Sequence, residues 1–292
     1  MKVLLTILIA FFSGFIFSQV KEIPAMGNVF WEISNKDNKN VSYLFGTIHL
    51  IDKDKYVLPK TVTKRLEKSD LVIMEIANLD DQSGMMEMIT LKKGRMTDVL
   101  SKIQRDSLYD FTERKFGMDS SMFESSMGKF KPVFFMQLPY ASLLMRCESY
   151  DKNLNALAQM KDIPIEGLET AEEQLGYFDN LSSEMQAKMI MQVIHDTSDL
   201  KKTWNDMQEL YLNQQVSDML TFNSGGADVM QFYEKTLSSD RNLRWIKTLS
   251  TRLNEKSTFI AVGAGHLPGD EGLINLLRKE AFIVSPVQIK LN

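Results

Sequence analysis

The chain has 292 residues, of which 44% are hydrophobic and 25% are charged, an ordinary globular composition with enough length for a large core. Its formal net charge of −4 gives no electrostatic reason to expect a nucleic-acid partner. A single cysteine, Cys147, excludes a framework of disulfides within the chain, and we assign it to packing inside a helix.

The N-terminal segment has the pattern of a targeting signal. Lys2 supplies a positive charge, residues 3–17 form an almost unbroken apolar stretch, and polar residues follow from Ser18. The apolar stretch is shorter than the roughly 20 residues that a membrane-spanning helix needs. We therefore expect residues 1–19 to be a signal peptide and residues 20–292 to form a single domain. This domain is expected to be exported, to the periplasm or the medium, with no stable membrane span after cleavage; an uncleaved anchor is the alternative.

The first predicted elements after this segment form a β-hairpin. Residues 28–34 alternate apolar and polar side chains as a half-buried strand does, residues 35–40 are a polar turn, and residues 41–45 form the second strand. The second strand leads into Gly46 and, three residues later, into His49. Glycine reaches positive φ without steric cost, so we expect a sharp turn that projects His49 from the end of the strand.

A buried strand is predicted at residues 70–76, after a short helix over residues 59–68 that begins with Pro59. Its apolar run is interrupted by Glu75, and an ionised carboxylate in such a run is costly unless it is paired or bound to a cation. Two interpretations stay open: Glu75 belongs to a functional site, or it is an exposed carboxylate at the tip of the strand.

The middle of the chain is predicted to be mostly helical. Residues 83–129 are rich in Met, which we assign to core packing. Residues 132–146 are expected to form a buried helix that Pro139 bends. An amphipathic helix over residues 150–159 follows, and then a strand and turn over residues 163–169.

Glu169 lies directly before a helix that begins near Thr170. Thr170 and Glu173 have the spacing of a capping box, in which each side chain binds the other residue's backbone N–H. Glu169 therefore either serves this helix terminus alone or contributes to a site. Residues 182–220 form a long helix or a pair of helices that carries His195, which no glycine turn precedes and which we assign to the surface or to a structural role.

The C-terminal part repeats the pattern of a strand, a glycine and a histidine. After a helix that begins near Arg241, residues 257–262 form the last core strand, and Gly263 is followed three residues later by His266. A further helix and a terminal strand complete the chain. Strands at both ends and helices between them predict an α/β fold, with a central sheet that carries paired strand–GxxH turns and a large helical insertion or cap.

Three segments resemble the TraB/PrgY/GumN family, which includes the TIKI proteases: residues 43–49 (YLFGTIH), 168–170 (LET) and 262–269 (VGAGHLPG). The resemblance extends over nearly all of the chain after the predicted signal peptide. It implies metal-dependent hydrolysis, and a more distant resemblance to erythromycin esterases implies His/Glu hydrolysis that needs no metal. Glu169 lies in the segment that resembles the family's L-E-T element, and Arg241 begins one that resembles its R-N or R-D element.

The candidate site residues are His49, His266, Glu75 and Glu169, since the sequence contains no G-x-S-x-G, H-E-x-x-H, P-loop or C-x-x-C motif. Imidazole and carboxylate ligands suit a divalent transition ion with water in an open position. We predict that His49, His266 and Glu169 bind such an ion (Mn, Co or Zn) and that Glu75 is catalytic. Arg241 is predicted either to stabilise a developing oxyanion or to pair with a carboxylate. Without a metal, one histidine would be the general base and Glu75 would orient it.

These residues predict a metal-dependent hydrolase of peptide or ester bonds, with a peptide or small molecule as substrate. The alternatives are a non-catalytic protein that binds heme or a metal through its histidine pair, a metal-independent His/Glu esterase, and a structural protein whose histidines only pack. The hydrolase interpretation also predicts a geometry. The strands before His49 and His266 run in the same direction in one sheet, Glu75 faces the same cleft, and His195 lies elsewhere. No oligomeric state is predicted.

Overall fold

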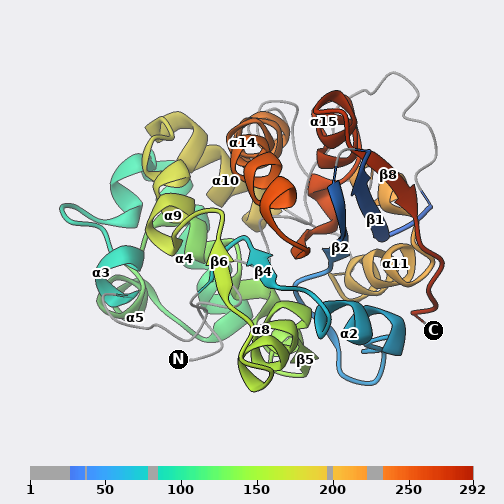
Figure 1. The fold of residues 1–292 in the computed structure, drawn as a ribbon. Coiled ribbons are helices and arrows are strands. Elements are labelled where there is room, and N and C mark those ends of the chain that lie inside the picture. The colour runs from blue at the N-terminus through green and yellow to red at the C-terminus, as the bar shows by residue number, and fades with distance from the viewer. Residues whose placement is uncertain (1–26, 37, 78–84, 196–199, 222–232, 292) are drawn as a thin grey trace.

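The computed structural model describes residues 27–36, 38–77, 85–195, 200–221 and 233–291, so the predicted signal peptide over residues 1–19 lies outside the described residues. The described part folds around a six-stranded mixed sheet with the strand order β6-β4-β7-β2-β1-β8 (Figure 1), which confirms the α/β prediction. The strands of this sheet are β1 (Phe30–Asn35), β2 (Asn38–Thr47), β4 (Leu71–Met74), β6 (Ile165–Gly167), β7 (Thr258–Gly263) and β8 (Ile283–Pro286).

Four neighbouring strands of the sheet run in the same direction. β6, β4, β7 and β2 are parallel, whereas β1 is antiparallel to both β2 and β8. β2 and β7 lead into the two GxxH histidines, so the prediction that these strands run the same way in one sheet is confirmed. Because the carboxyl ends of parallel strands meet at one edge of a sheet, the segments that follow these four strands lie close together.

The burial of the strands accounts for their sequences. Every residue of β4 and β7 is buried, as expected for central parallel strands that are covered on both faces. β1 and β2 form the predicted hairpin, in which Phe30 is paired with Phe45 and Asn35 with Asn38. The hairpin therefore places β2, with its histidine, beside the buried strand β7.

Helices cover both faces of the sheet. They are α2 (Lys60–Leu66), α3 (Met85–Ile89), α4 (Lys102–Phe116), α5 (Ser120–Ser126), α6 (Pro132–Phe135), α7 (Ala141–Leu144), α8 (Tyr150–Met160), α9 (Ala171–Asp179), α10 (Ser183–His195), α11 (Leu200–Leu212), α12 (Val216–Thr221), α14 (Asp240–Glu255) and α15 (Leu273–Lys279), with a 3-10 helix η1 (Met96–Val99) and a π-helix η3 (Tyr233–Ser239). α14 and α15 pack on one side and α2 and α8 on the other, while α3, α4, α5, α9 and α10 form a block on the β6 side (Figure 1). None of the described helices is long and apolar enough to cross a membrane.

The predicted helix over residues 132–146 is divided into three short segments. The 3-10 helix η2 (Leu138–Tyr140) separates α6 from α7, because Pro139 has no N–H to donate and its ring interrupts a continuous helix. The assignment of Cys147 to a helix is also wrong, since Cys147 belongs to β5 (Cys147–Glu148), which pairs with β3 (Ile51–Asp52). Burial, and after it the nearby Asp52 carboxylate, raises the pKa of the Cys147 thiol to about 12, which is consistent with packing.

Candidate active site

The segments that follow the four parallel strands bring the predicted site residues together. His49 follows β2, Glu75 follows β4, Glu169 follows β6, and His266 ends the 3-10 helix η4 (Ala264–His266) directly after β7. Arg241 reaches them from the first turn of α14. All five residues are buried, none of them more than 8% exposed.

The two motif glycines do not form the expected positive-φ turns. Gly46 is still part of β2, Gly263 ends β7 with φ −54°, and neither has a positive φ. Gly46 is required for another reason: a Cβ atom there would lie 2.9 Å from Leu267 Cδ2 and 3.1 Å from Ala264 Cα. The absent side chain therefore lets η4 approach β2 closely, and this approach holds His266 at the sheet edge.

Arg241 joins the two buried carboxylates. Its Nη2 donates hydrogen bonds to Glu75 and Glu169, and its Nη1 donates to the carbonyl oxygen of Leu237 at 3.0 Å. Gln174 Nε2 bridges the same pair, at 3.1 Å from Glu75 Oε2 and 2.8 Å from Glu169 Oε1. Of the two roles predicted for Arg241, pairing with a carboxylate is therefore present, and it involves two carboxylates.

The neighbouring charge keeps Glu75 ionised. Burial is the largest single influence and raises the pKa of Glu75, but the Arg241 guanidinium, the two histidines and the N–H of Gly263, which donates to Glu75 Oε1 at 2.8 Å, together lower it by more. The net result is a pKa well below the ordinary value of a glutamate. The alternative of an exposed carboxylate at a strand tip is wrong, since Glu75 is a buried and compensated anion.

His49 is held by a carboxylate on the opposite side of its ring from Glu75. Its Nδ1 lies 2.6 Å from Asp151 Oδ2, and its Nε2 lies 3.7 Å from Glu75 Oε1. Asp151 Oδ1 in turn accepts a hydrogen bond from Thr47 Oγ1 at 3.0 Å. Burial lowers the pKa of His49, but Asp151, and to a smaller extent Glu75, raises it, so that the pKa lies above its ordinary value. Asp151 thus fixes Nδ1 as the donor, which makes Nε2 the nitrogen that can accept a proton.

His266 is held as a neutral ring, and its pKa is shifted in the opposite direction from that of His49. Asn242 Nδ2 donates to the backbone carbonyls of His266 and Glu271, at 3.2 and 2.8 Å, so its Oδ1 is the acceptor that faces His266 Nδ1 at 2.7 Å. The proton on Nδ1 leaves a lone pair on Nε2, which accepts from Arg241 Nη1 at 3.2 Å. Burial lowers the pKa of His266 to about 3, so the ring is neutral at physiological pH. The ring also packs against Trp245, with 4.5 Å between ring centres.

The described arrangement does not fit a resident metal ion. Within the described ranges, no group of three or more His, Cys, Asp or Glu side chains is arranged to hold one. The electron pairs that a metal would need already accept hydrogen bonds: His266 Nε2 from Arg241, and the Glu169 oxygens from Arg241, Gln174 and Tyr177. A divalent ion bound there would also lie beside a guanidinium cation. His49 and His266 nevertheless share a centre, since the Nε2 of each lies within 3.8 Å of Glu75 Oε1.

Sequence reasoning missed Asp151 and Asn242. Asp151 carried a signal, because it lies on one helical face with Leu154 and Ala158, and a carboxylate on an apolar face requires a partner. Asn242 carried a signal as the second residue of the segment that resembles the family's R-N or R-D element, but only Arg241 was assigned a role. The exposure of His195 at the end of α10 agrees with its assignment to the surface.

Comparisons with known proteins agree with the resemblance of the motifs. A family model described as "TraB/PrgY/gumN family" matches residues 29–286. A curated relative from Nematostella vectensis, "Metalloprotease TIKI homolog", is 30% identical over 112 residues, which cover 34% of this chain and 24% of the relative. The chain therefore matches about a quarter of that relative's length. No solved structure matches the chain.

Proposed function

Since the chain belongs to the TraB/PrgY/gumN family, we propose that it is a hydrolase of peptide or ester bonds in which His49 is the general base. The contact of 2.6 Å between His49 Nδ1 and Asp151 Oδ2 carries this proposal. A histidine whose Nδ1–H is bound by a buried carboxylate presents Nε2 as a proton acceptor, and the carboxylate stabilises the imidazolium that forms. His49 Nε2 would take a proton from the attacking water beside Glu75.

Arg241 and Trp245 have the properties of donors for the oxyanion. Arg241 Nε and Trp245 Nε1 are buried N–H groups for which the described residues supply no acceptor. The two residues are four positions apart on α14, and Arg241 Cζ lies 4.5 Å from the centre of the Trp245 ring. A carbonyl oxygen that enters the site would find two donors that are not already in use, and such fixed donors stabilise the charge that develops on it.

The metal-dependent form of this reaction is the second candidate. It is favoured by the name of the relative, a metalloprotease homologue, and by the two histidines that face one carboxylate oxygen. The described side chains, however, do not form a ligand set for the ion. We also infer that the enzyme acts outside the cytoplasm as one domain, residues 20–292, because residues 1–19 have the pattern of a signal peptide.

The test compares wild type with His49→Ala and, as a matched histidine control, His195→Ala. Peptide and ester libraries should be turned over by wild type and by His195→Ala, and by His49→Ala at least about a hundredfold more slowly. Metal analysis of the same three preparations separates the two forms of the reaction: metal that is bound stoichiometrically by wild type and lost in His49→Ala would favour the metal-dependent one. Stoichiometric ligand binding without any turnover would instead indicate a binding protein.

A further inference from the structure

A pocket lies beside the C-terminal end of α9, the end that is farther from the buried carboxylates of Glu75 and Glu169. Its volume is about 80 Å³, several times the ~10–15 Å³ that one water needs, so it can hold an aliphatic side chain. Six of the residues that line it are apolar: Leu91, Pro132, Val133, Phe178, Leu181 and Met189.

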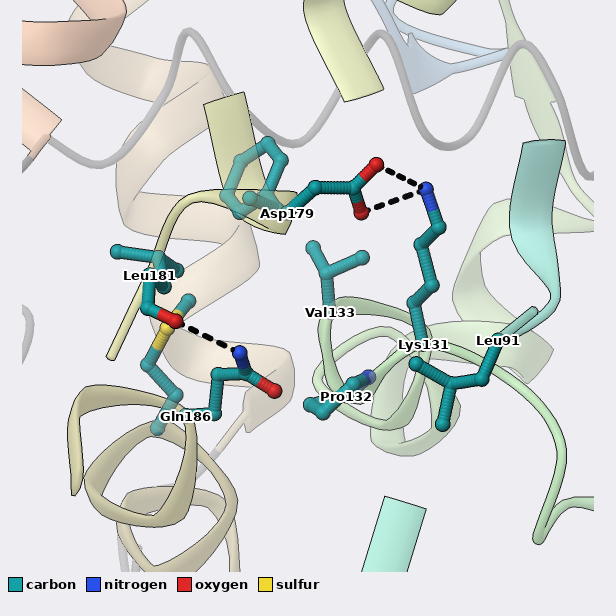
Figure 2. Close-up of a pocket in the computed structure, with 9 residues that line it drawn as sticks. Leu91, Lys131, Pro132, Val133, Asp179, Leu181 and Gln186 are labelled. Atoms are coloured by element: carbon teal, nitrogen blue, oxygen red, sulfur yellow. Dashed lines mark hydrogen bonds and ion pairs between the residues drawn. The ribbon is translucent and has the colours of Figure 1, made fainter. Parts of the chain in front are cut away.

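One wall of the pocket carries an ion pair with unequal exposure. Lys131 Nζ lies 2.6 and 2.7 Å from the two carboxylate oxygens of Asp179, and Figure 2 shows this pair at the side of the pocket. The Lys131 side chain is 13% exposed, whereas that of Asp179 is 51% exposed. Asp179 can therefore turn into water at little cost, while Lys131 stays at the wall, where its backbone N–H is bound to the carbonyl of Ile89 at 3.0 Å. A carboxylate from a ligand could take the place of Asp179.

The opposite wall offers an acceptor. Gln186 Nε2 donates to the carbonyl oxygen of Leu181 at 2.8 Å, which orients the amide. Figure 2 shows the amide oxygen turned away from this bond, on the side of Pro132. These groups match the C-terminal residue of a peptide. The apolar walls suit its side chain, the Lys131 ammonium group suits its carboxylate, and the Gln186 amide oxygen can accept a hydrogen bond from its N–H.

α9 sets the distance between this pocket and the active site. Gln174, which bridges Glu75 and Glu169, and Phe178, which lines the pocket, are four residues apart and share one face of the helix. At 1.5 Å per residue, the rise between them is about 6 Å. An extended peptide covers about 3.3 Å per residue, so the pocket is roughly two residues from the buried carboxylates.

We propose that this pocket binds the C-terminal residue of a peptide substrate, with Lys131 taking its carboxylate in exchange for Asp179. The inference rests on the proposed hydrolysis and makes it specific: the preferred substrates are peptides with a free carboxylate and an aliphatic C-terminal residue, cut about two residues from that end.

The experiment uses acetyl-Ala-Ala-Leu with a free carboxylate and the same peptide as a C-terminal amide. Binding is measured by calorimetry in the His49→Ala protein, where turnover is expected to be at least about a hundredfold slower. The acid should bind more tightly than the amide. Lys131→Met should weaken binding of the acid by about tenfold and leave that of the amide unchanged. Asp179→Asn should tighten binding of the acid, because it removes the internal competitor. Lys129→Met, which removes an exposed lysine two residues away, is the matched control and should change neither.

Equal binding of acid and amide, or a shift in the same direction for Lys131→Met and Asp179→Asn, would overturn the proposal. If Lys131→Met does not fold, as judged by circular dichroism, Asp179→Asn decides alone: it should tighten binding of the acid, and unchanged or weaker binding would overturn the proposal. Turnover of the two peptides by wild type separates this inference from the hydrolase itself. Selective binding without cleavage would refute the hydrolase and keep the pocket, whereas cleavage that ignores the C-terminal carboxylate would keep the hydrolase and refute the pocket.

Discussion

Replacing Arg241 with Met removes the guanidinium that joins two buried carboxylates. Glu75 and Glu169 are 3% and 8% exposed, so water cannot replace the lost cation. Each carboxylate would keep only uncharged hydrogen-bond donors: Gln174 for both, the Gly263 N–H for Glu75 and the Tyr177 hydroxyl for Glu169. Removal of one partner of a buried ion pair costs about 3–5 kcal/mol, because an uncompensated charge stays behind. We expect a loss of this size in the free energy of unfolding at pH 7.

The loss of unfolding free energy in Arg241→Met should depend on pH, and the pKa of Glu75 determines the direction of this dependence. In wild type, Arg241 holds the pKa of Glu75 well below 4.5, its ordinary value. This stabilisation is fully present above about pH 4.5 and disappears as the pH falls through the folded-state pKa. In Arg241→Met, burial raises the pKa of Glu75 without opposition from the cation, so the carboxylate takes up a proton at higher pH. The difference between the two proteins should therefore be largest at pH 7 and should shrink towards pH 4.

Urea unfolding followed by circular dichroism, at pH 7 and pH 4.5, measures both effects. Arg252→Met is the control, because Arg252 also contacts two carboxylates, those of Glu166 and Glu255, but on the exposed face of α14. It should cost much less than Arg241→Met, since exposed ion pairs contribute little. Equal losses for the two variants at pH 7, or a loss for Arg241→Met that does not shrink on acidification, would refute the reasoning.

Two further substitutions test other parts of the site. Asp151→Asn should lower the hydrolysis rate by about 10²–10⁴. Because Asp151 raises the pKa of His49, the acid limb of kcat/KM should lie above pH 6.5 in wild type and move to lower pH in the variant; an unmoved limb would exclude His49 as the base. Gly46→Ala should cost about 1–3 kcal/mol, because its Cβ would lie 2.9 Å from Leu267 Cδ2. In contrast, Gly176→Ala has open space inside α9 and should be neutral or stabilising, so equal melting temperatures would contradict the packing argument.

Patterns that depend on neighbouring residues were predictable from the sequence. The alternation in the first hairpin and the buried runs of β4 and β7 follow from side-chain period and burial, and the structure has all of these strands. The capping box of Thr170 and Glu173 is present, with both reciprocal hydrogen bonds. The repeated GxxH motif marked His49 and His266 as residues that follow strands, because glycine and histidine at this spacing are recognisable without any tertiary contact.

The tertiary structure decided what each of these residues contacts. β2 and β7 are more than two hundred residues apart in the chain, and their parallel pairing is a property of the whole sheet. Asp151 binds His49, which lies 102 positions earlier in the chain. Arg241 on α14 binds Glu75, which follows β4, and Glu169, which follows β6. Gly46 is required because η4 packs against it, a constraint that its own φ angle does not reveal. Local sequence determines secondary structure and marks polar residues that need partners, whereas sheet order and helix packing determine which partners they find.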